Sequence, residues 1–488
     1  MPLPYVVLWP LVAATLCLVL PPGNNAAAGL TLAAALATLT TVGLLTRQVL
    51  AYGPQATPGL WLYADALSMV ILLLVALVVT TAAAYSWGYV RRDFAAGEIG
   101  RGRLKRYYVL FNLFAASMVA VPLVNNLGLL WMVVGATTLT SAFLVWFYRR
   151  PEALEAAWKY LLLTSVGSLL ALFGTVLTYC AAVPVFGTTF ALEWTALRGA
   201  GSLLQPEALK LGFLLVVIGY GTKAGLAPMH TWLPDAHSQA PSPVCALLSG
   251  AELNCALYAV MRFYVLAAGG LGRELPGTLL MGFGLFSVLL AALFLLTQRD
   301  FKRLLAYSSV EHMGLVAAGA GFGGPVGYYG ALFQMLNHAL AKSLLFYTAG
   351  NVLHRYRTTR LTEAHGLLRA MPLTGVLALA GALAITGVPP FSTFWSKFFI
   401  AVAGLEGGHR LLTALLLLCL VAVFAGFLQA VGRLCFGPAP NPVPAGEQGP
   451  AMTVPILASV LVLLAVGFYL PPWLDALLRG AAAVLAGP

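Results

Sequence analysis

The sequence predicts an all-α, polytopic membrane protein. Of its 488 residues, 60% are hydrophobic and only 9% are charged, whereas a soluble domain carries about 25% charged residues. The mean hydropathy is +0.89, and apolar runs long enough to cross a bilayer as helices recur along the whole chain. Basic residues in short loops between these runs give the net charge of +11. Membrane topology explains that charge better than binding to nucleic acid does.

We expect about fourteen membrane spans, because each needs about 20 apolar residues. They divide the chain into three N-terminal spans with a basic loop (1–106), two units of five spans (107–270 and 271–438) and a C-terminal span (439–488). The spans centre on residues 3–21, 27–46, 60–88, 107–123, 126–148, 156–182, 208–229, 241–266, 276–297, 304–322, 326–353, 373–402, 410–436 and 452–470.

Basic residues are unevenly distributed between alternate loops. Loops after odd-numbered spans, with the span ends beside them, carry seventeen Lys and Arg, and the opposite loops carry seven. Cytoplasmic loops of membrane proteins are enriched in Lys and Arg. We therefore expect both termini on the extracytoplasmic side of the cell's inner membrane.

Two spans are interrupted by proline. The seventh span breaks at Pro228 in LAPMHTWLP, and the twelfth breaks at Pro389 and Pro390 in GVPPF, five spans later. Because five is odd, two five-span units at this interval would have opposite orientations in the membrane. Paired broken helices at matching positions indicate inverted repeats around a central site, so spans four to eight and nine to thirteen are the expected repeats. Prolines are also common in membrane helices without such a role.

Several ionisable residues fall inside apolar spans, where a charge is costly and usually marks an ion or proton path. Lys223 lies just before the first break, and Lys397 lies just after the second. Because burial disfavours the charged form, such groups can exchange protons near neutral pH. The other candidates for proton transfer are Glu252 in the eighth span, Glu311 and His312 in the tenth, and His338 and Lys342, one helical turn apart, in the eleventh. The alternatives are hydrogen bonding between helices and, for Lys223, a position at the membrane interface.

The chain contains no redox or nucleotide-binding motif. Its six cysteines stand singly in or beside apolar runs, and we expect them to be small buried apolar side chains. Iron–sulfur clusters and structural zinc need clustered thiolates, and the glycine-rich nucleotide motifs are absent from the sequence. We therefore expect no catalytic residue, cofactor or metal in this chain, and any redox chemistry in partner subunits.

Four segments carry a family resemblance: GTKAGLAPMHTWLPDAHSQAPSPVCALLSG, RDFKRLLAYSSVEHMG, NHALAKSLLFYTAG and GVPPFSTFWSKF. They resemble the antiporter-like subunits of respiratory complex I, of group 4 membrane-bound hydrogenases and of multisubunit cation/proton antiporters. SSVEHMG and ELNCALYAVMRFY are most similar to the hydrogenase-4 component F type. The resemblance covers residues 60–435 and implies fourteen helices, inverted repeats and proton translocation driven by redox chemistry. It implies as partners other membrane subunits and a peripheral cytoplasmic arm, which would hold any nickel–iron centre, iron–sulfur clusters, flavin or quinone.

The resemblance assigns roles residue by residue. Lys223 matches the family's central lysine of the seventh span, and Lys397 matches the lysine or glutamate after the twelfth-span break. Lys342 and His338 match the polar pair of the eleventh span. Lys159 resembles the sixth-span lysine, although it lies near the cytoplasmic end.

One family residue is missing. The family pattern W-x-x-x-E-A-T-T-L places a glutamate in the fifth span, where it pairs with the seventh-span lysine, but Gly135 stands at that position here. A strong effect on a buried ammonium needs an opposite charge within about 4–6 Å. Glu252 is the only acid deep in the first repeat, so we expect it to lie close to Lys223 and to replace the missing carboxylate.

Three functions fit the sequence. The first is a proton-translocating membrane subunit of a group 4 hydrogenase or a complex I-like NADH–quinone oxidoreductase. The second is a structural connector whose proton path is degraded at Gly135, and the third is a cation/proton antiporter component without a redox partner. In each case we expect contact with the lipid bilayer and none with nucleic acid. The basic loop from Arg91 to Arg106 is a candidate docking site or a contact with lipid headgroups, and the headgroup contact is the simpler interpretation.

Overall fold

The computed structural model describes residues 2–21, 23, 25–437 and 444–487. Almost all of them are helical, which confirms the all-α class, and one short antiparallel ladder joins β1 (Gln55–Ala56) to β2 (Tyr63–Ala64). The helices are α1 (Leu3–Val19), α2 (Ala26–Tyr52), η1 (Pro58–Leu60), α3 (Ala66–Ala95), α4 (Arg101–Ala120), α5 (Leu127–Val145), α6 (Pro151–Phe190), α7 (Trp194–Leu197), η2 (Gly201–Leu203), α8 (Pro206–Ala224), α9 (Trp232–Gln239), α10 (Ser242–Leu247), η3 (Leu248–Glu252), α11 (Leu253–Leu271), α12 (Glu274–Leu295), α13 (Phe301–Phe322), α14 (Gly324–Tyr356), α15 (Leu367–Ala370), α16 (Pro372–Thr386), α17 (Ser392–Glu406), α18 (Arg410–Phe436), α19 (Pro450–Phe468) and α20 (Pro472–Ala486).

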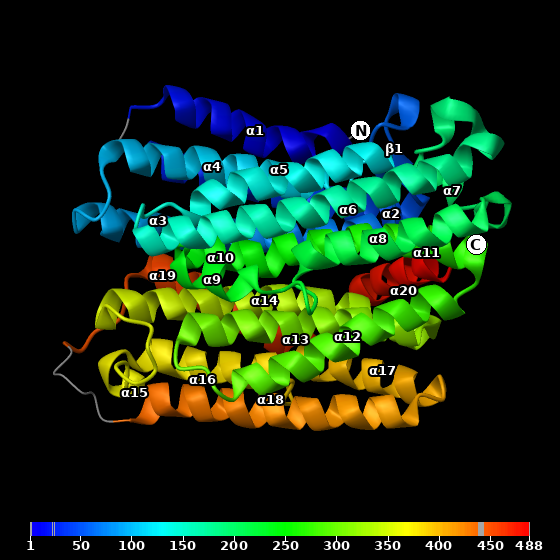
Figure 1. The fold of residues 1–488 in the computed structure, drawn as a ribbon. Helices are drawn as coiled ribbons and strands as arrows, with labels where there is room; N and C mark the ends of the chain where they lie inside the picture. Colours follow the sequence, from blue (N-terminus) through cyan, green and yellow to red (C-terminus); the bar gives the residue numbers. More distant parts are fainter. Residues whose placement is uncertain (1, 22, 24, 438–443, 488) are drawn as a thin grey trace.

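The long helices run side by side in one bundle, with α1 at one edge and α18 at the other (Figure 1). α14 lies inside the bundle, where it packs against α3, α13, α17, α19 and α20. Glycines bring neighbouring backbones close together. A Cβ added at Gly219 on α8 would lie 2.5 Å from the amide nitrogen of Ala171 on α6, and one at Gly284 on α12 would lie 2.5 Å from that of Ala318 on α13. Small residues at such contacts allow membrane helices to pack closely.

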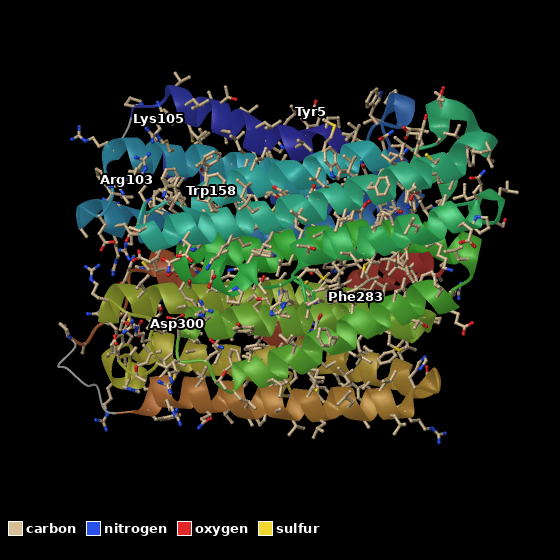
Figure 2. All side chains as sticks on the ribbon, in the orientation of Figure 1. Tyr5, Arg103, Lys105, Trp158, Phe283 and Asp300 are labelled. Atoms are coloured by element: carbon tan, nitrogen blue, oxygen red, sulfur yellow. The ribbon has the colours of Figure 1, made fainter. Side chains whose placement is uncertain are left out.

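The surface of the bundle suits a lipid environment. Eight helices within the described residues are long and apolar enough to cross a membrane, namely α2, α3, α5, α6, the run from α10 to α11, α12, α18 and α19. Tyr5 and Trp158, which are 52% and 54% exposed, lie on the outside (Figure 2), and ionisable side chains are buried between the helices. This distribution is that of a polytopic membrane protein. The other helices are shorter or more polar, so the number fourteen stays a prediction.

The C-terminal helix and one cysteine differ from the sequence-based expectation. After the last expected span, the chain forms an additional helix, α20, whose Leu474, Leu477 and Leu478 are buried in its contacts with α3 and α14. Its sequence was too short to count as a span. Cys180 was expected to be buried, and this was wrong, because it lies on an outward-facing side of α6, whereas the other five cysteines are buried.

The seventh and twelfth expected spans are each divided into two helices. Pro228 lies in the non-helical segment between α8 and α9, and Pro389 and Pro390 lie in the one between α16 and α17. The first helix of each pair ends at a glycine with a left-handed backbone, Gly225 (φ 76°) and Gly387 (φ 85°). Such a C-terminal glycine closes a helix without the steric cost that a Cβ would add. The peptide bonds before Pro228 and Pro390 are cis.

A buried ion pair joins the N-terminal helices to α11. The Arg262 guanidinium donates two hydrogen bonds of 2.7 Å to the carboxylate of Asp65, the N-cap residue of α3. It also donates to Ser68 and Tyr258 at 2.8 Å and lies 4.0 Å from the ring centre of Trp194. Arg262 is one of the seven Lys and Arg that the sequence assigns to the opposite loops and span ends, and that assignment is wrong, because Arg262 lies within α11 and is 4% exposed. Its position fixes α11 against the start of α3.

Candidate functional site

The first cluster of buried charge surrounds Lys223, in the last turn of α8. Its ammonium donates to Glu252 Oε1 at 2.6 Å, to Thr138 Oγ1 at 2.5 Å and to the Tyr160 hydroxyl at 3.3 Å. The Lys223 and Glu252 side chains are only 4% and 1% exposed. The proximity of Glu252 to Lys223 that the sequence predicted is therefore confirmed.

One oxygen of Glu252 receives all of its hydrogen bonds. Besides Lys223, the Tyr160 hydroxyl donates to Oε1 at 2.9 Å and Ser141 donates at 3.3 Å. Oε2 has no hydrogen-bond partner within the described part of the chain. The carboxylate is thus anchored through Oε1, and Oε2 is the oxygen that can accept a proton or a water.

An irregular turn brings Glu252 to Lys223. Leu248–Glu252 form a π-helical turn, η3, between α10 and α11. A π turn inserts an extra residue into a helix and so rotates the side chains that follow, and such turns are frequent at functional sites. Regular helical periodicity cannot reveal this rotation, so the sequence predicted the residue and not the geometry that places it.

The position of the missing family glutamate is open. Gly135 lies on α5, one turn before Thr138, whose hydroxyl contacts Lys223. A Cβ added at Gly135 would have no heavy atom within 4 Å. Gly135 therefore leaves space beside α5, while Glu252 approaches Lys223 from another helix.

The second cluster surrounds Lys397, in the second turn of α17. Its ammonium lies 3.1 Å from Glu311 Oε1 on α13 and 3.4 Å from the backbone carbonyl of Thr386, the last residue of α16. The other oxygen of Glu311 lies 3.2 Å from Nε2 of the neighbouring His312. Glu311 and His312 are fully buried. A lysine, a carboxylate and an imidazole thus lie next to one another in space beside the second helix break.

Two histidines lie between the two clusters. The His312 and His338 rings are 5.0 Å apart between centres. His338 Nε2 lies 3.1 Å from the carbonyl oxygen of Ser249, which belongs to the same π-helical turn as Glu252. We call Lys223, Glu252, His338, His312, Glu311 and Lys397 the buried polar row.

Lys342 and Lys159 differ in their relation to this row. Lys342 is fully buried on α14, one turn from His338, and donates to the backbone carbonyl of Leu305. It is close enough to Glu311 and Lys397 to interact with both electrostatically. The Lys159 side chain is instead 48% exposed and pairs with Glu155 and Asp235 at 2.6 and 3.2 Å. The structure therefore places Lys159 outside the buried row.

Sequence reasoning missed the polar side chains that orient the row. The Gln334 amide contacts His312 Nδ1, and Ser396 donates to the Gln334 oxygen at 2.5 Å. Asn337 donates to Ser396 at 3.1 Å. Gln334, Asn337 and His338 are three and four residues apart and therefore share one face of α14. That spacing was a usable signal, whereas nothing in the sequence marked Tyr160.

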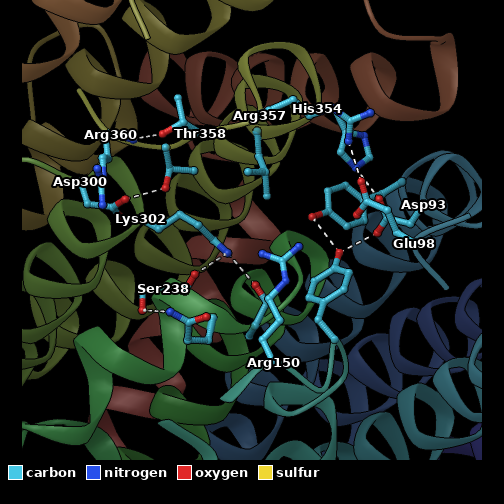
Figure 3. Close-up of a pocket in the computed structure, with 16 residues that line it drawn as sticks. Asp93, Glu98, Arg150, Ser238, Asp300, Lys302, His354, Arg357, Thr358 and Arg360 are labelled. Carbon is cyan, nitrogen blue, oxygen red and sulfur yellow. Dashed lines mark hydrogen bonds and ion pairs between the residues drawn. The ribbon is translucent and has the colours of Figure 1, made fainter. Parts of the chain in front are cut away.

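A polar cavity of about 290 Å³ is lined by Asp93, Asp300, Lys302 and His354, among other residues (Figure 3). At its wall, Asp93 accepts hydrogen bonds from His354 at 2.9 Å and from the Tyr148 hydroxyl at 2.6 Å. Lys302 also lines the cavity and donates to the backbone carbonyl of Ala240 at 2.6 Å. The cavity therefore brings titratable groups from α3, α13 and α14 together.

His237 lies between this cavity and the buried row. It precedes Ser238, which lines the cavity, and its ring is fully buried and stacks on Phe346 at 4.9 Å. Neither ring nitrogen has a hydrogen-bond partner among the residues that the structure describes. Lys302 and Lys342 both lie close enough to interact electrostatically with it. His237 belongs to the segment GTKAGLAPMHTWLPDAHSQAPSPVCALLSG, but no signal in the sequence marked it as a candidate.

Comparisons with known proteins agree with this architecture. The profile of the family described as NADH:quinone oxidoreductase/Mrp antiporter, transmembrane, matches residues 124–424. The hydrogenase-4 component F homolog of Methylacidiphilum infernorum is 36% identical over 418 residues, which cover 85% of this chain and 87% of that protein. A chain of respiratory complex I from Thermus thermophilus superposes with a TM-score of 0.79 and 27% identity over 98% of this chain and 100% of that chain. A chain of the archaeal membrane-bound sulfane sulfur reductase superposes with a TM-score of 0.86, 23% identity and coverage of 99% and 97%, which shows a shared fold.

The chain thus falls in the class of antiporter-like membrane subunits. It belongs to the NADH:quinone oxidoreductase/Mrp antiporter transmembrane family, which confirms the resemblance seen in its sequence segments.

Proposed function

We propose that this chain is a proton-translocating membrane subunit of a redox-driven complex of the group 4 hydrogenase or complex I type. The observation that carries the proposal is the buried polar row, in which two lysine–carboxylate pairs stand on either side of two histidines. Ionisable groups at membrane depth are costly and are retained where protons or ions move. Packing alone does not explain why six such groups lie in one row.

The hydrogen bonds determine which ring nitrogen of each histidine carries the proton. The His338 Nε2–H donates to the Ser249 carbonyl, so Nδ1, which has no hydrogen-bond partner among the described residues, is the nitrogen that can accept a proton. The Gln334 amide donates to His312 Nδ1, so the His312 proton is on Nε2, facing Glu311. His338 can thus take up and release a proton at Nδ1, whereas His312 can take one up only when the Gln334 amide turns away from its Nδ1. Water would complete the gaps between the rings and the two clusters.

In each ion pair, protonation of the carboxylate would control release of the proton from the lysine. A proton arriving at Glu252 neutralises the carboxylate that stabilises the Lys223 ammonium, and the lysine then releases its own proton. The same reasoning applies to Glu311 and Lys397 at the other end of the row. Each pair therefore responds to the protonation state of the groups beside it, which is how a lateral relay would operate.

The polar cavity is the proposed connection between the row and the aqueous phase. Asp93 and His354 would collect protons there, and His237 would carry them past Lys302 to Lys342. Because Lys302, His237 and Lys342 repel one another when charged, a charge on one disfavours a charge on its neighbours. That coupling would make His237 a gate rather than an open path.

The fourteen-span topology and the two inverted repeats belong to the same proposal. The boundaries are those expected from the sequence: 1–106, 107–270, 271–438 and 439–488. Support comes from the two helix pairs interrupted at Pro228 and at Pro389 and Pro390, which lie five spans apart. Both chain ends lie toward the same end of the bundle (Figure 1), in agreement with two extracytoplasmic termini in the inner membrane.

Partners and cofactors follow from the relatives. The structural neighbours are chains of multisubunit membrane complexes. We propose other membrane subunits and a peripheral cytoplasmic redox arm as partners of this chain, together with the bilayer. The nickel–iron centre, iron–sulfur clusters, flavin or quinone would reside in those subunits, and this chain would contribute proton transfer only.

The test is proton transport by the complete complex in proteoliposomes, followed with a pH-sensitive dye during redox turnover. His338→Gln keeps the size of the side chain but cannot be protonated, so it should abolish transport through this subunit while the redox reaction continues. The matched control is His365→Gln, because His365 lies in a loop outside the row. Wild-type transport in the His338→Gln complex would refute the relay.

A cation/proton antiporter component is the second candidate, because the matching family includes Mrp antiporters. Purification of the native assembly separates the two functions. Co-purifying nickel–iron or iron–sulfur subunits support the redox-driven complex, and an assembly of membrane subunits alone supports the antiporter. A structural connector would be indicated if the wild-type and His338→Gln complexes both assembled normally and His338→Gln had no effect on transport.

A further inference from the structure

A groove with a basic rim lies between α1, α4 and α5. It has a volume of about 670 Å³, within the range of about 300–1,000 Å³ that small-molecule sites occupy. Its walls are apolar and include Leu18, Leu110, Phe143 and Trp146. The groove therefore offers an apolar surface open to the outside of the bundle.

Four cationic side chains surround the groove: Arg103, Lys105, Arg106 and Arg149. None of them forms an ion pair with an acid in the described part of the chain. Figure 2 shows Arg103 and Lys105 at the same end of the bundle as Asp300. Arg149 lies 5.6 Å from the ring centre of Trp146, so one cation reaches over an apolar wall of the groove.

We propose that this groove is a specific binding site for one anionic phospholipid. The guanidinium groups of Arg103, Arg106 and Arg149 would hold the phosphate, because arginine binds phosphate through paired hydrogen bonds. An acyl chain would lie along Phe143 and Leu110. Basic pockets between membrane helices at the cytoplasmic side select anionic headgroups, and the loop charges place this end of the bundle there.

The combination of charge and shape distinguishes this site from non-specific lipid contacts elsewhere around the bundle. Basic residues at membrane surfaces attract anionic lipids without a groove, and apolar grooves accept any acyl chain. Here the unpaired cations and the groove coincide, so headgroup and chain can be held by one site. The occupant is therefore expected to survive extraction that removes loosely bound lipid. The site is independent of the proton path.

The test measures lipid retained by the complete complex after extensive detergent washing, by mass spectrometry. The washed wild-type complex is then offered equal amounts of cardiolipin, phosphatidylglycerol and phosphatidylethanolamine. It should retain the two anionic lipids and not the zwitterionic one. The double variant Arg103→Gln with Arg106→Gln should retain at most about one tenth of the anionic lipid that the wild-type complex retains. The matched control, Arg299→Gln with Arg369→Gln, removes two exposed arginines outside the groove and should retain the wild-type amount.

A second variant tests the apolar part without changing charge. Leu110→Trp should fill the groove and reduce retention of the same lipids. Equal retention by the groove variants and the control would overturn the proposal, as would equal retention of phosphatidylethanolamine. Loss of a partner subunit from the double variant, with lipid unchanged, would overturn it in favour of protein docking.

Discussion

Lys223 at the end of α8 and Glu252 in a π-helical turn form a buried ion pair, with 2.6 Å between Nζ and Oε1. A buried ion pair adds little net stability, because desolvation of the two charges offsets their attraction. Its presence inside a membrane protein therefore points to function. Gly135 provides no carboxylate for Lys223, and Glu252 provides one from another helix. Proton transfer is therefore compatible with the absence of the glutamate in the family pattern.

We predict that Glu252→Gln will lower redox-coupled proton transport by about 100-fold or more, in the range of lost acid–base groups. The amide cannot neutralise the Lys223 ammonium, and an isolated buried ammonium loses its proton. Adding Gly135→Glu to this variant should restore part of the transport, since a Cβ at Gly135 meets no heavy atom within 4 Å. Proton uptake by proteoliposomes is the measurement. A silent Glu252→Gln variant would favour a structural connector for this half of the chain.

We predict that Lys223→Ala and Lys397→Ala will each strongly reduce proton transport and leave assembly intact. Each substitution removes the proton carrier of one ion pair in the row. Lys159→Ala is the matched control, because Lys159 is half-exposed and pairs with surface carboxylates, and it should transport at close to the wild-type rate. Assembly is checked by size-exclusion chromatography of the complex. Wild-type pumping by both lysine variants would exclude the relay.

The sequence predicted which charged residues are buried better than it predicted how they are held. Lys223 and Lys397 stood out because charge inside an apolar span beside a proline break is improbable by chance. Glu252 followed from the absence of a carboxylate at Gly135. The turn that aims Glu252 depends on packing of α10 and α11, which no periodic pattern encodes.

Local sequence also left part of the packing unpredicted. Arg262 resembled a loop charge because its partner, Asp65, lies almost two hundred residues away in the sequence. His237 stood within a recognised motif, yet its burial against Phe346 on α14 is a tertiary contact. α20 was missed because its apolar face is too short for a span.

We predict that His237→Gln will slow proton transport by about tenfold or more, with the redox reaction of the complex retained. Glutamine has a similar size and polarity but cannot carry a proton between the cavity and Lys342. His409→Gln is the matched control, since His409 stacks on Phe322 and belongs to neither the row nor the cavity. Transport is measured as before, with Lys223→Ala in parallel. Loss in Lys223→Ala without loss in His237→Gln would reject the proposed entry path and keep the relay.

The last prediction concerns stability rather than transport. Arg262→Leu should destabilise the protein by about 3–5 kcal/mol, because it leaves the buried Asp65 carboxylate without its counter-ion. The double variant Asp65→Leu with Arg262→Leu removes both charges and should recover most of that loss, since apolar replacement of a whole buried pair is often neutral. Thermal unfolding of the purified complex, followed by tryptophan fluorescence, compares the three proteins. Arg479→Leu is the control, because the exposed Arg479–Asp475 pair should contribute within about 1 kcal/mol. If the double variant unfolds at a temperature as low as the single one, the destabilisation does not come from the unpaired Asp65 carboxylate. The contacts of Arg262 with Tyr258 and Trp194 would then account for the difference.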